Sequence, residues 1–123
     1  LSKTEAKRYG VQAGDVVILD CGNPPRLTDS YVEEYVTPSV AAAEYLVSRG
    51  VACVATDALG VDPPGATIEE HDVHRTLLSA GTRIIEGVDN LEPVEPGRYD
   101  VIATPIPYRG LDGAQVRLLV SPQ

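Results

Sequence analysis

The sequence contains no methionine, tryptophan or phenylalanine, and cysteine is scarce, with Cys21 and Cys53 alone. These two lie about thirty positions apart, without a Cys-x-x-Cys pattern or a neighbouring histidine, which excludes a zinc knuckle and a dithiol redox pair. Cys53 lies in a short apolar run and is predicted to be a small buried residue. Cys21 follows an apolar run at a Gly-Asn-Pro-Pro turn, where a packing role and a place in a site both stay open.

Basic residues are also few, since ten lysines and arginines stand against 18 acidic residues, for a net charge of -8. Such a charge repels phosphate backbones and anionic lipid surfaces, so we expect no nucleic acid and no membrane as a partner. No apolar run approaches the roughly 20 residues that span a bilayer, and the start of the chain lacks the apolar core of a signal peptide. These absences predict a soluble, cytoplasmic protein.

The length of 123 residues, of which 43% are hydrophobic, is typical of one domain. A domain of this size buries roughly two-thirds of the surface that its unfolded chain exposes, which is enough for a core without disulfides. We therefore expect a single domain over residues 1–123.

Hydrophobic periodicity and turn residues predict an α/β fold. Helices are expected over residues 2–10, 38–49 and 67–80, because each stretch opens at a serine or threonine cap and closes at a glycine. Apolar runs predict strands over residues 15–20, 51–56, 82–86, 99–104 and 114–120. The stretch from Cys21 to Pro38 is a predicted surface loop, and Asp112–Gly113 is a predicted hairpin turn.

Both histidines of the chain lie on the third predicted helix. At about 100° per residue, His74 falls beside the apolar side of this helix, and His71 lies one turn earlier. A histidine in such a place is commonly satisfied by a backbone carbonyl, whereas paired histidines near acidic residues can bind a metal. His74 is the stronger candidate ligand, because His71 lies closer to solvent. The apolar side is predicted to comprise Ile68, Val73, Leu77 and Ala80.

Glu86 ends the strand predicted over residues 82–86, directly after two isoleucines. A carboxylate there is costly to bury unless a cation neutralises it, whereas a strand-end glutamate that points to solvent needs none. His74 and Glu86 supply two ligands, and a catalytic zinc or manganese site takes three or more from protein. Asp57 and Asp62, in the next loop upstream, are either pocket-wall groups or plain turn formers.

Several segments resemble the cyclase family, which includes kynurenine formamidase and isatin hydrolase. Residues 71–78 read His-Asp-Val-His-Arg-Thr-Leu-Leu, and residues 81–91 read Gly-Thr-Arg-Ile-Ile-Glu-Gly-Val-Asp-Asn-Leu. Residues 57–63 resemble the family's Asp-x-x-Ser-Val-Asp-Pro, with Gly60 where serine is usual. Residues 103–117 resemble the closing Pro-Leu-x-x-x-Gly-x-Asp-Gly-x-x-Val-Arg segment. The segments follow the family's order along nearly all of the chain.

The resemblance implies a swivelling β/β/α domain, with a mixed sheet and flanking helices, that hydrolyses amides, often N-formyl or cyclic ones, with a divalent metal. In the family, the residues that match His74 and Glu86 are ligands of that metal, zinc or manganese. The other ligands and the catalytic histidine come from an upstream His-x-Gly-Thr-His-x-Asp-x-Pro-x-His motif, which this sequence lacks. The chain thus resembles the C-terminal half of the fold, and its catalytic residues stay unknown.

Two interpretations of function follow. In the first, the chain is part of an amide hydrolase for a small-molecule substrate, and an N-terminal fragment or companion chain with the His/Asp motif completes the metal site. In the second, the chain is a non-catalytic cyclase-like scaffold or binding module. The absence of methionine and the start at Leu1 favour a cut chain and the first interpretation. A half-fold exposes sheet edges and an apolar face, so we also expect association with the missing part or, as a homo-oligomer, with a second copy.

Overall fold

The computed structural model describes residues 3–23 and 34–123, and contacts divide the chain into two compact units after Leu91. Unit 1, up to Leu91, contains helices α1 to α3 and strands β1 to β3, and unit 2 contains strands β4 and β5. The α/β class expected from the sequence is confirmed. A single domain over residues 1–123 stays a prediction.

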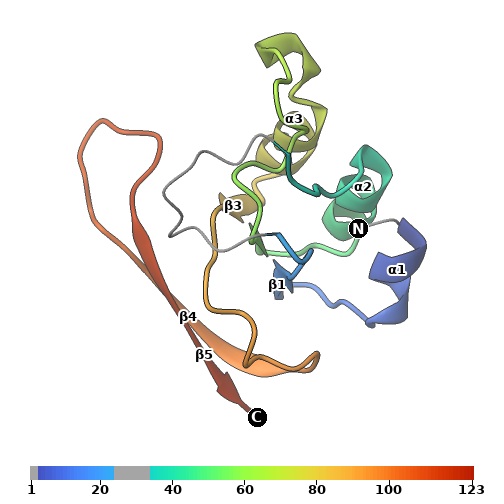
Figure 1. Cartoon of the computed structure of the whole chain (residues 1–123), viewed down its shortest axis with the longest axis vertical. Coiled ribbons are helices and arrows are strands. Elements are labelled where there is room, and N and C mark those ends of the chain that lie inside the picture. Colours follow the sequence, from blue (N-terminus) through green and yellow to red (C-terminus); the bar gives the residue numbers. More distant parts are fainter. Residues whose placement is uncertain (1–2, 24–33) are drawn as a thin grey trace. The chain divides into compact units, whose positions relative to one another are not determined.

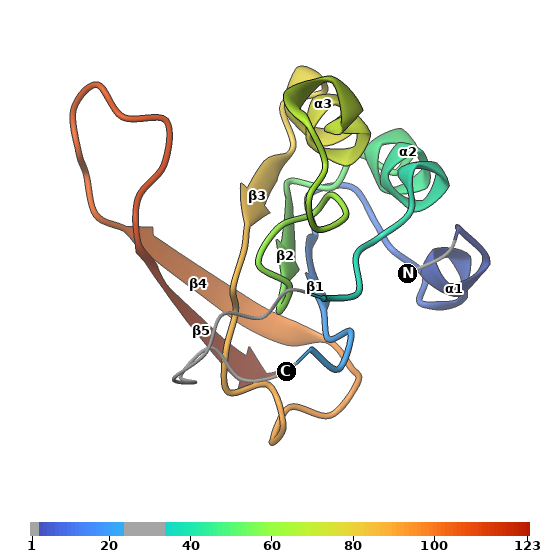
Figure 2. The same ribbon diagram turned by 45° about the horizontal axis from the view of Figure 1, so that its top comes forward.

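The sheet of unit 1 consists of β1 (Val16–Leu19), β2 (Cys53–Thr56) and β3 (Arg83–Ile85), in that order and all parallel (Figure 2). β2 lies at the centre, and every one of its residues is buried, Cys53 included, as predicted. A central strand of a parallel sheet is covered on both faces, which explains the unbroken apolar run in the sequence. Because the strands are parallel, their carboxyl ends lie at the same edge of the sheet.

α2 (Val40–Ser48) connects β1 to β2 and is bounded by clear end signals. The Ser39 hydroxyl oxygen caps its start by accepting a hydrogen bond from the Ala42 N–H at 3.2 Å. After its end, Gly50 adopts a φ of 74°, a left-handed conformation that glycine tolerates without strain. The helix predicted over residues 38–49 is confirmed, with slightly narrower bounds.

α1 (Lys3–Arg8) is the opening helix expected over residues 2–10. Its predicted cap, Ser2, lies outside the described residues. α1 packs beside α2 (Figure 1), and Lys7 Nζ lies 6.0 Å from the centre of the Tyr45 ring of α2. α1 thus extends the helical layer at the side of α2.

α2 and α3 (Asp72–Ser79) cover the same face of the sheet (Figure 2). Both helices connect neighbouring strands of a sheet whose order follows the chain, and right-handed crossovers then place them on one side. The apolar core between helices and sheet includes Leu19, Ala43, Leu46, Val54, Val61, Val73 and Leu77. This core holds α3 against the sheet, so it also fixes the side chains that project from the first turn of α3.

The third predicted helix consists of two pieces, a 3-10 turn, η1 (Ile68–Glu70), and the helix α3. His71 lies between them and has a non-helical ψ of 59°. The capping box at the start of η1 is confirmed: Glu70 Oε2 accepts the Thr67 N–H at 2.9 Å and the Thr67 hydroxyl at 3.1 Å. These two hydrogen bonds, the backbone one first, lower the pKa of the exposed Glu70 carboxyl.

Part of the predicted apolar side is wrong, at Ile68 because the helix is interrupted at His71 and at Ala80 because α3 ends at Ser79. Val73 and Leu77 are buried as expected, but Ile68 is 80% exposed and Ala80 is exposed as well. The periodicity of 3.6 residues relates only positions within one continuous helix. Because the helix is broken at His71, Ile68 does not share the face of α3.

Unit 2 is an antiparallel strand pair of β4 (Tyr99–Pro105) and β5 (Val116–Pro122). Both predicted strands are confirmed, although β5 begins two residues later than expected. Ile102 and Leu119 lie opposite each other across the pair and are 60% and 52% exposed. The strand pair therefore exposes two large apolar side chains next to each other.

The predicted tight turn at Asp112–Gly113 is wrong. β4 and β5 are joined by residues 106–115, and the Ile106 N–H donates to the Gln115 carbonyl at 3.0 Å where this loop begins. Gly110, at a φ of 75°, bends the chain before Asp112 is reached. An Asp-Gly pair makes a two-residue hairpin turn only when the strands reach it on both sides, and here they stop short.

Residues 24–33 of the loop predicted over 21–38 lie outside the described residues, and the flanking segments 21–23 and 34–38 have no regular structure. In the described parts of the chain, the helices are too short or too polar to cross a bilayer.

Candidate metal centre

Acidic side chains follow the carboxyl ends of the parallel strands. Asp57 comes directly after β2, and Glu86 comes directly after β3. α3 begins at the same edge, because it runs back along the sheet before the parallel strand β3. In open α/β sheets this edge is where ligands bind, so the fold places these side chains where a site is expected.

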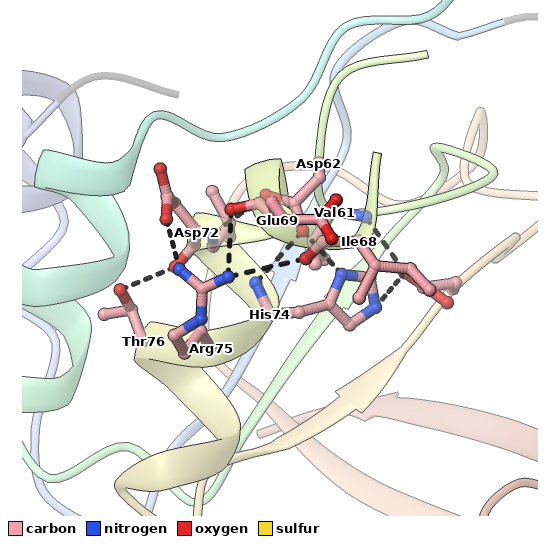
Figure 3. A network of polar contacts seen from close by, with 10 residues as sticks. Val61, Asp62, Ile68, Glu69, Asp72, His74, Arg75 and Thr76 are labelled. Carbon is pink, nitrogen blue, oxygen red and sulfur yellow. Dashed lines mark hydrogen bonds and ion pairs between the residues drawn. The ribbon is translucent and has the colours of Figure 1, made fainter. Parts of the chain in front are cut away.

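Asp62, in the loop before η1, holds the ring of His74 in the first turn of α3 (Figure 3). His74 Nδ1 lies 2.6 Å from Asp62 Oδ2, a short charge-assisted contact. The same carboxylate accepts the N–H of Val73 at 2.8 Å and the N–H of His74 at 3.2 Å. Asp62 therefore caps α3, a role that the N-cap residue His71 leaves open because its side chain makes no capping bond.

The ionisation of Asp62 determines which nitrogen of His74 is available. Burial acts to raise the pKa of Asp62, but the hydrogen bonds from the His74 ring and from two backbone N–H groups outweigh it and lower that pKa. An ionised carboxylate only accepts hydrogen bonds, so the shared proton belongs to His74 Nδ1. In the neutral ring, Nε2 then carries the free lone pair.

We expect Asp62→Asn to lower the free energy of unfolding by about 2 kcal/mol at neutral pH, because hydrogen bonds to charged groups contribute about 1.5–3 kcal/mol. Folding lowers the pKa of Asp62, so this stabilisation is complete above the unfolded value of about 3.9 and is lost as the pH falls through the folded value. Denaturant unfolding between about pH 7 and pH 2 measures both effects. Asp112→Asn, at an exposed bend, is the control, and a wild-type advantage that persists unchanged at the acid end would contradict the prediction.

Glu86 lies on the other side of the His74 ring. Its Oε1 is 3.3 Å from His74 Nε2 and accepts the Val61 N–H at 2.9 Å. The two side chains are 30% and 32% exposed, so the pair is accessible from solvent. The structure thus brings together the two residues that the sequence predicted as metal ligands, with Nε2 of the ring facing the carboxylate.

The spacing of these two atoms suits ligands of one cation. With bonds of about 2.0–2.2 Å, two ligands of a tetrahedral zinc ion lie about 3.4 Å apart. The 3.3 Å between His74 Nε2 and Glu86 Oε1 is close to this value.

A second group, Asp62, His71 and His74, also offers ligand atoms within 4.8 Å of one another. Within this group, Asp62 Oδ2 and His74 Nδ1 are 2.6 Å apart and share a proton, so Nδ1 is not available to a metal while it holds this contact. The remaining ring nitrogen of His74, Nε2, faces Glu86. Of the two groups, we therefore favour the pair of His74 and Glu86.

His71 stacks on His74, with ring centres 5.3 Å apart and an interplanar angle of 28°. The η1 turn that leads to His71 is held to α3 by Arg75, which donates to Asp72 Oδ1 at 2.6 Å and to the Glu69 carbonyl at 3.0 Å (Figure 3). Arg75 and Asp72 are more than half exposed, so their ion pair orients the turn and adds little stability.

Asp57 is buried and serves the loop after β1. It accepts the N–H groups of Cys21 at 3.1 Å and Asn23 at 2.8 Å, together with the side-chain amide of Asn23 at 2.8 Å. Burial first, and then the nearby charge of Asp57, raises the pKa of the Cys21 thiol. A protonated thiol is a poor nucleophile and a poor metal ligand, which argues for a packing role of Cys21.

The family model described as "Putative cyclase" matches residues 1–63, just over half of the chain. The chain belongs to the cyclase family. Kynurenine formamidase of Sphingopyxis alaskensis is 37% identical to it over 73 residues, which are 59% of this chain and 34% of that protein. Kynurenine formamidase of Salinibacter ruber is 41% identical over 75 residues, 61% of this chain and again 34% of the relative. The chain spans about a third of the length of these curated relatives.

Two solved structures are similar to nearly all of this cyclase-family chain. One, described as a potential metal-dependent hydrolase with cyclase activity, has a TM-score of 0.82 and 34% identity, and the match covers 98% of this chain and 57% of that one. The other, a predicted metal-dependent hydrolase from Bacillus stearothermophilus, has a TM-score of 0.81 and 34% identity, with 97% and 55% covered. The cyclase fold expected from the sequence is confirmed, and this chain covers a little over half of it.

The role of Asp62 in this member of the cyclase family was not predicted from the sequence. A capping residue is usually recognised in a sequence because it directly precedes the helix. Asp62 is separated from α3 by η1, so its position in the sequence does not identify it as the cap of that helix. Neither the pocket-wall role nor the turn-forming role considered for Asp62 includes the contact with His74. A hint in the sequence was the resemblance of residues 57–63 to the family's Asp-x-x-Ser-Val-Asp-Pro, in which Asp62 matches the second aspartate.

Proposed function

We propose that this chain is part of a metal-dependent hydrolase that cleaves an amide, N-formyl or cyclic, and that His74 and Glu86 hold its divalent cation. The observation that supports this is the 3.3 Å approach of His74 Nε2 to Glu86 Oε1 while Asp62 occupies Nδ1. A carboxylate on the far nitrogen is the usual support of a metal-binding imidazole. The names of the similar proteins, kynurenine formamidase and metal-dependent hydrolase, support the reaction class.

The donor atoms fit the proposed cation. An imidazole nitrogen with a carboxylate oxygen suits zinc or manganese better than a calcium ion, which prefers oxygen ligands alone. A divalent cation in such a place lowers the pKa of a water molecule toward neutrality and polarises the scissile carbonyl.

Two neighbouring residues of one loop orient the two proposed ligands. Asp62 keeps the proton on His74 Nδ1, and the Val61 N–H fixes Glu86 Oε1. Val61 itself is fully buried in the core of unit 1. The packing of this loop therefore sets the position of both ligands at once.

Two ligands are fewer than the three or more that a catalytic cation takes from protein. We therefore propose that an N-terminal fragment or a companion chain with His/Asp ligands completes the site, and that the protein acts as an oligomer on a small molecule. Its catalytic base would belong to that partner. A cytoplasmic location stays a prediction from composition.

The test is hydrolysis of an N-formyl arylamine and of a cyclic amide by the protein isolated under native conditions, with any polypeptide that accompanies it. We expect hydrolysis that EDTA abolishes and that added zinc or manganese restores. Denaturing mass analysis of the same preparation identifies a stoichiometric second polypeptide. A metal-loaded preparation that contains such a partner and still hydrolyses neither amide would favour the non-catalytic scaffold.

A further inference from the structure

A tyrosine hydroxyl and the Glu86 carboxylate both lie close to the position that a side chain of residue 60 would occupy. A Cβ atom added to Gly60 would lie 3.2 Å from Tyr35 Oη and 3.7 Å from Glu86 Oε1. Gly60 does not have a positive φ, so residues other than glycine can adopt its backbone conformation. What the glycine provides here is room, since it lets the Tyr35 hydroxyl approach the carboxylate side of the candidate metal centre.

Tyr35 lies in the segment before α2, outside the strands and helices, and the Asn23 side chain fixes the backbone beside it. The Val36 N–H donates to Asn23 Oδ1 at 2.7 Å, and Asn23 Nδ2 donates to the Val36 carbonyl at 3.1 Å. This pair of hydrogen bonds reproduces the pattern between two strand residues, and it restrains the residue next to Tyr35 in both position and orientation.

Asn23 is in turn anchored to the end of β2. Its backbone N–H and its side-chain amide both donate to the carboxylate of Asp57 at 2.8 Å. Asp57 is 6% exposed and follows the fully buried Thr56. A continuous series of hydrogen bonds therefore leads from the most buried strand of unit 1 to the segment that carries Tyr35.

We propose that Tyr35 is a positioning residue for Glu86, so that its hydroxyl supports the carboxylate in the orientation that holds the metal. The inference rests on the proposed function, because it assigns Tyr35 to the metal pair of His74 and Glu86. An ionised carboxylate offers about four lone-pair sites to donors, and the Val61 N–H uses one of them. A phenol beside it can donate without adding charge. Removing a hydrogen-bond donor that supports a metal ligand typically lowers the affinity for the metal by about 10-fold to 100-fold.

The test is calorimetric titration with zinc of the wild-type chain, Tyr35→Phe and Tyr108→Phe. Tyr35→Phe removes only the hydroxyl and should weaken zinc binding about tenfold, while leaving the midpoint of thermal unfolding unchanged. Tyr108 is 51% exposed in unit 2, so Tyr108→Phe is the matched control and should bind zinc as the wild type does.

A second pair of variants tests the geometry without removing the tyrosine. Gly60→Ala places a methyl group 3.2 Å from Tyr35 Oη, so the ring must move by a few tenths of an ångström. We expect weaker zinc binding and, in protein labelled with carbon-13 tyrosine, a shifted Tyr35 ring resonance. Gly113→Ala meets no atom within 4 Å and should change neither measurement.

Each outcome separates this inference from the proposed function. If the wild type binds zinc, Glu86→Gln loses it and Tyr35→Phe binds as the wild type does, the role of Tyr35 is overturned and the metal pair stands. A Tyr35 resonance that neither Gly60→Ala nor Glu86→Gln shifts overturns it as well. A wild-type protein that binds no zinc even in a preparation that contains its co-purifying polypeptide overturns the metal role of His74 and Glu86, and the supporting role of Tyr35 with it.

Discussion

Replacing either His74 by alanine or Glu86 by glutamine is expected to weaken zinc binding to this chain by more than about 100-fold. Loss of a residue that only supports a metal ligand costs about 10-fold to 100-fold in affinity, and loss of a ligand itself should cost more. The reason is that His74 Nε2 and Glu86 Oε1 face each other at 3.3 Å, so removing one of the two proposed ligands leaves the other to bind the cation by itself. Calorimetric titration with zinc and with manganese at constant pH measures the loss.

His71→Ala is the matched control for these variants, because His71 stacks on His74 and lies on the same stretch of chain. We expect it to retain zinc affinity within a few-fold of the wild type. The opposite pattern, loss with His71→Ala and none with Glu86→Gln, would assign the cation to the group of Asp62, His71 and His74 and would contradict the proposed pair.

The verified 123-residue chain alone is expected to be silent as an amidase, even when it is loaded with zinc or manganese. Its two histidines are both on one stretch of chain, and His74 and Glu86 provide too few donors for a catalytic cation. The proposed partner would also supply the general base, whose contribution alone is typically 10²-fold to 10⁴-fold. Hydrolysis of an N-formyl arylamine, followed with and without the co-purifying polypeptide, measures the difference.

The same preparation tests association. Ile102 and Leu119 expose an apolar pair on β4 and β5, and a two-stranded hairpin is marginally stable in water by itself. We expect an interface above roughly 2,000 Å², apolar at its centre, as obligate interfaces are. Size exclusion with light scattering reports the mass, and a stable, well-folded and amidase-active monomer of 13.1 kDa would contradict both the silence and the association.

The elements of unit 1 could be predicted because their signals are local. The run that became β2 is apolar throughout, and α2 has Ser39 and Gly50 at its two ends, so periodicity and capping specified both. The same reasoning went wrong at Ile68, because nothing in the local pattern shows that His71 leaves the helical conformation. It also went wrong at Asp112–Gly113, where the extent of the strands determines the turn.

The candidate site was predicted in part. The residue types and the resemblance to the cyclase family pointed to His74 and Glu86, and the structure places their facing atoms 3.3 Å apart. Asp62 and Tyr35 were missed in the roles described here. Asp62 contacts His74 from the loop before η1, and the Tyr35 hydroxyl lies near Gly60 from the segment before α2. Side chains that reach a site across a loop leave no periodic pattern in the sequence.

The sequence by itself determined the α/β class, the family and the two candidate ligands, because hydrophobic periodicity, caps and motifs are properties of short segments. Only the tertiary structure decided that Asp62 binds the far side of the His74 ring and that Val61 fixes Glu86. It also decided that His74 presents Nε2 to the carboxylate. The physical reason is that the loop of Val61 and Asp62 takes its position from the packing of Val61 into the core, and that packing exists only once α3 and the parallel strands have come together.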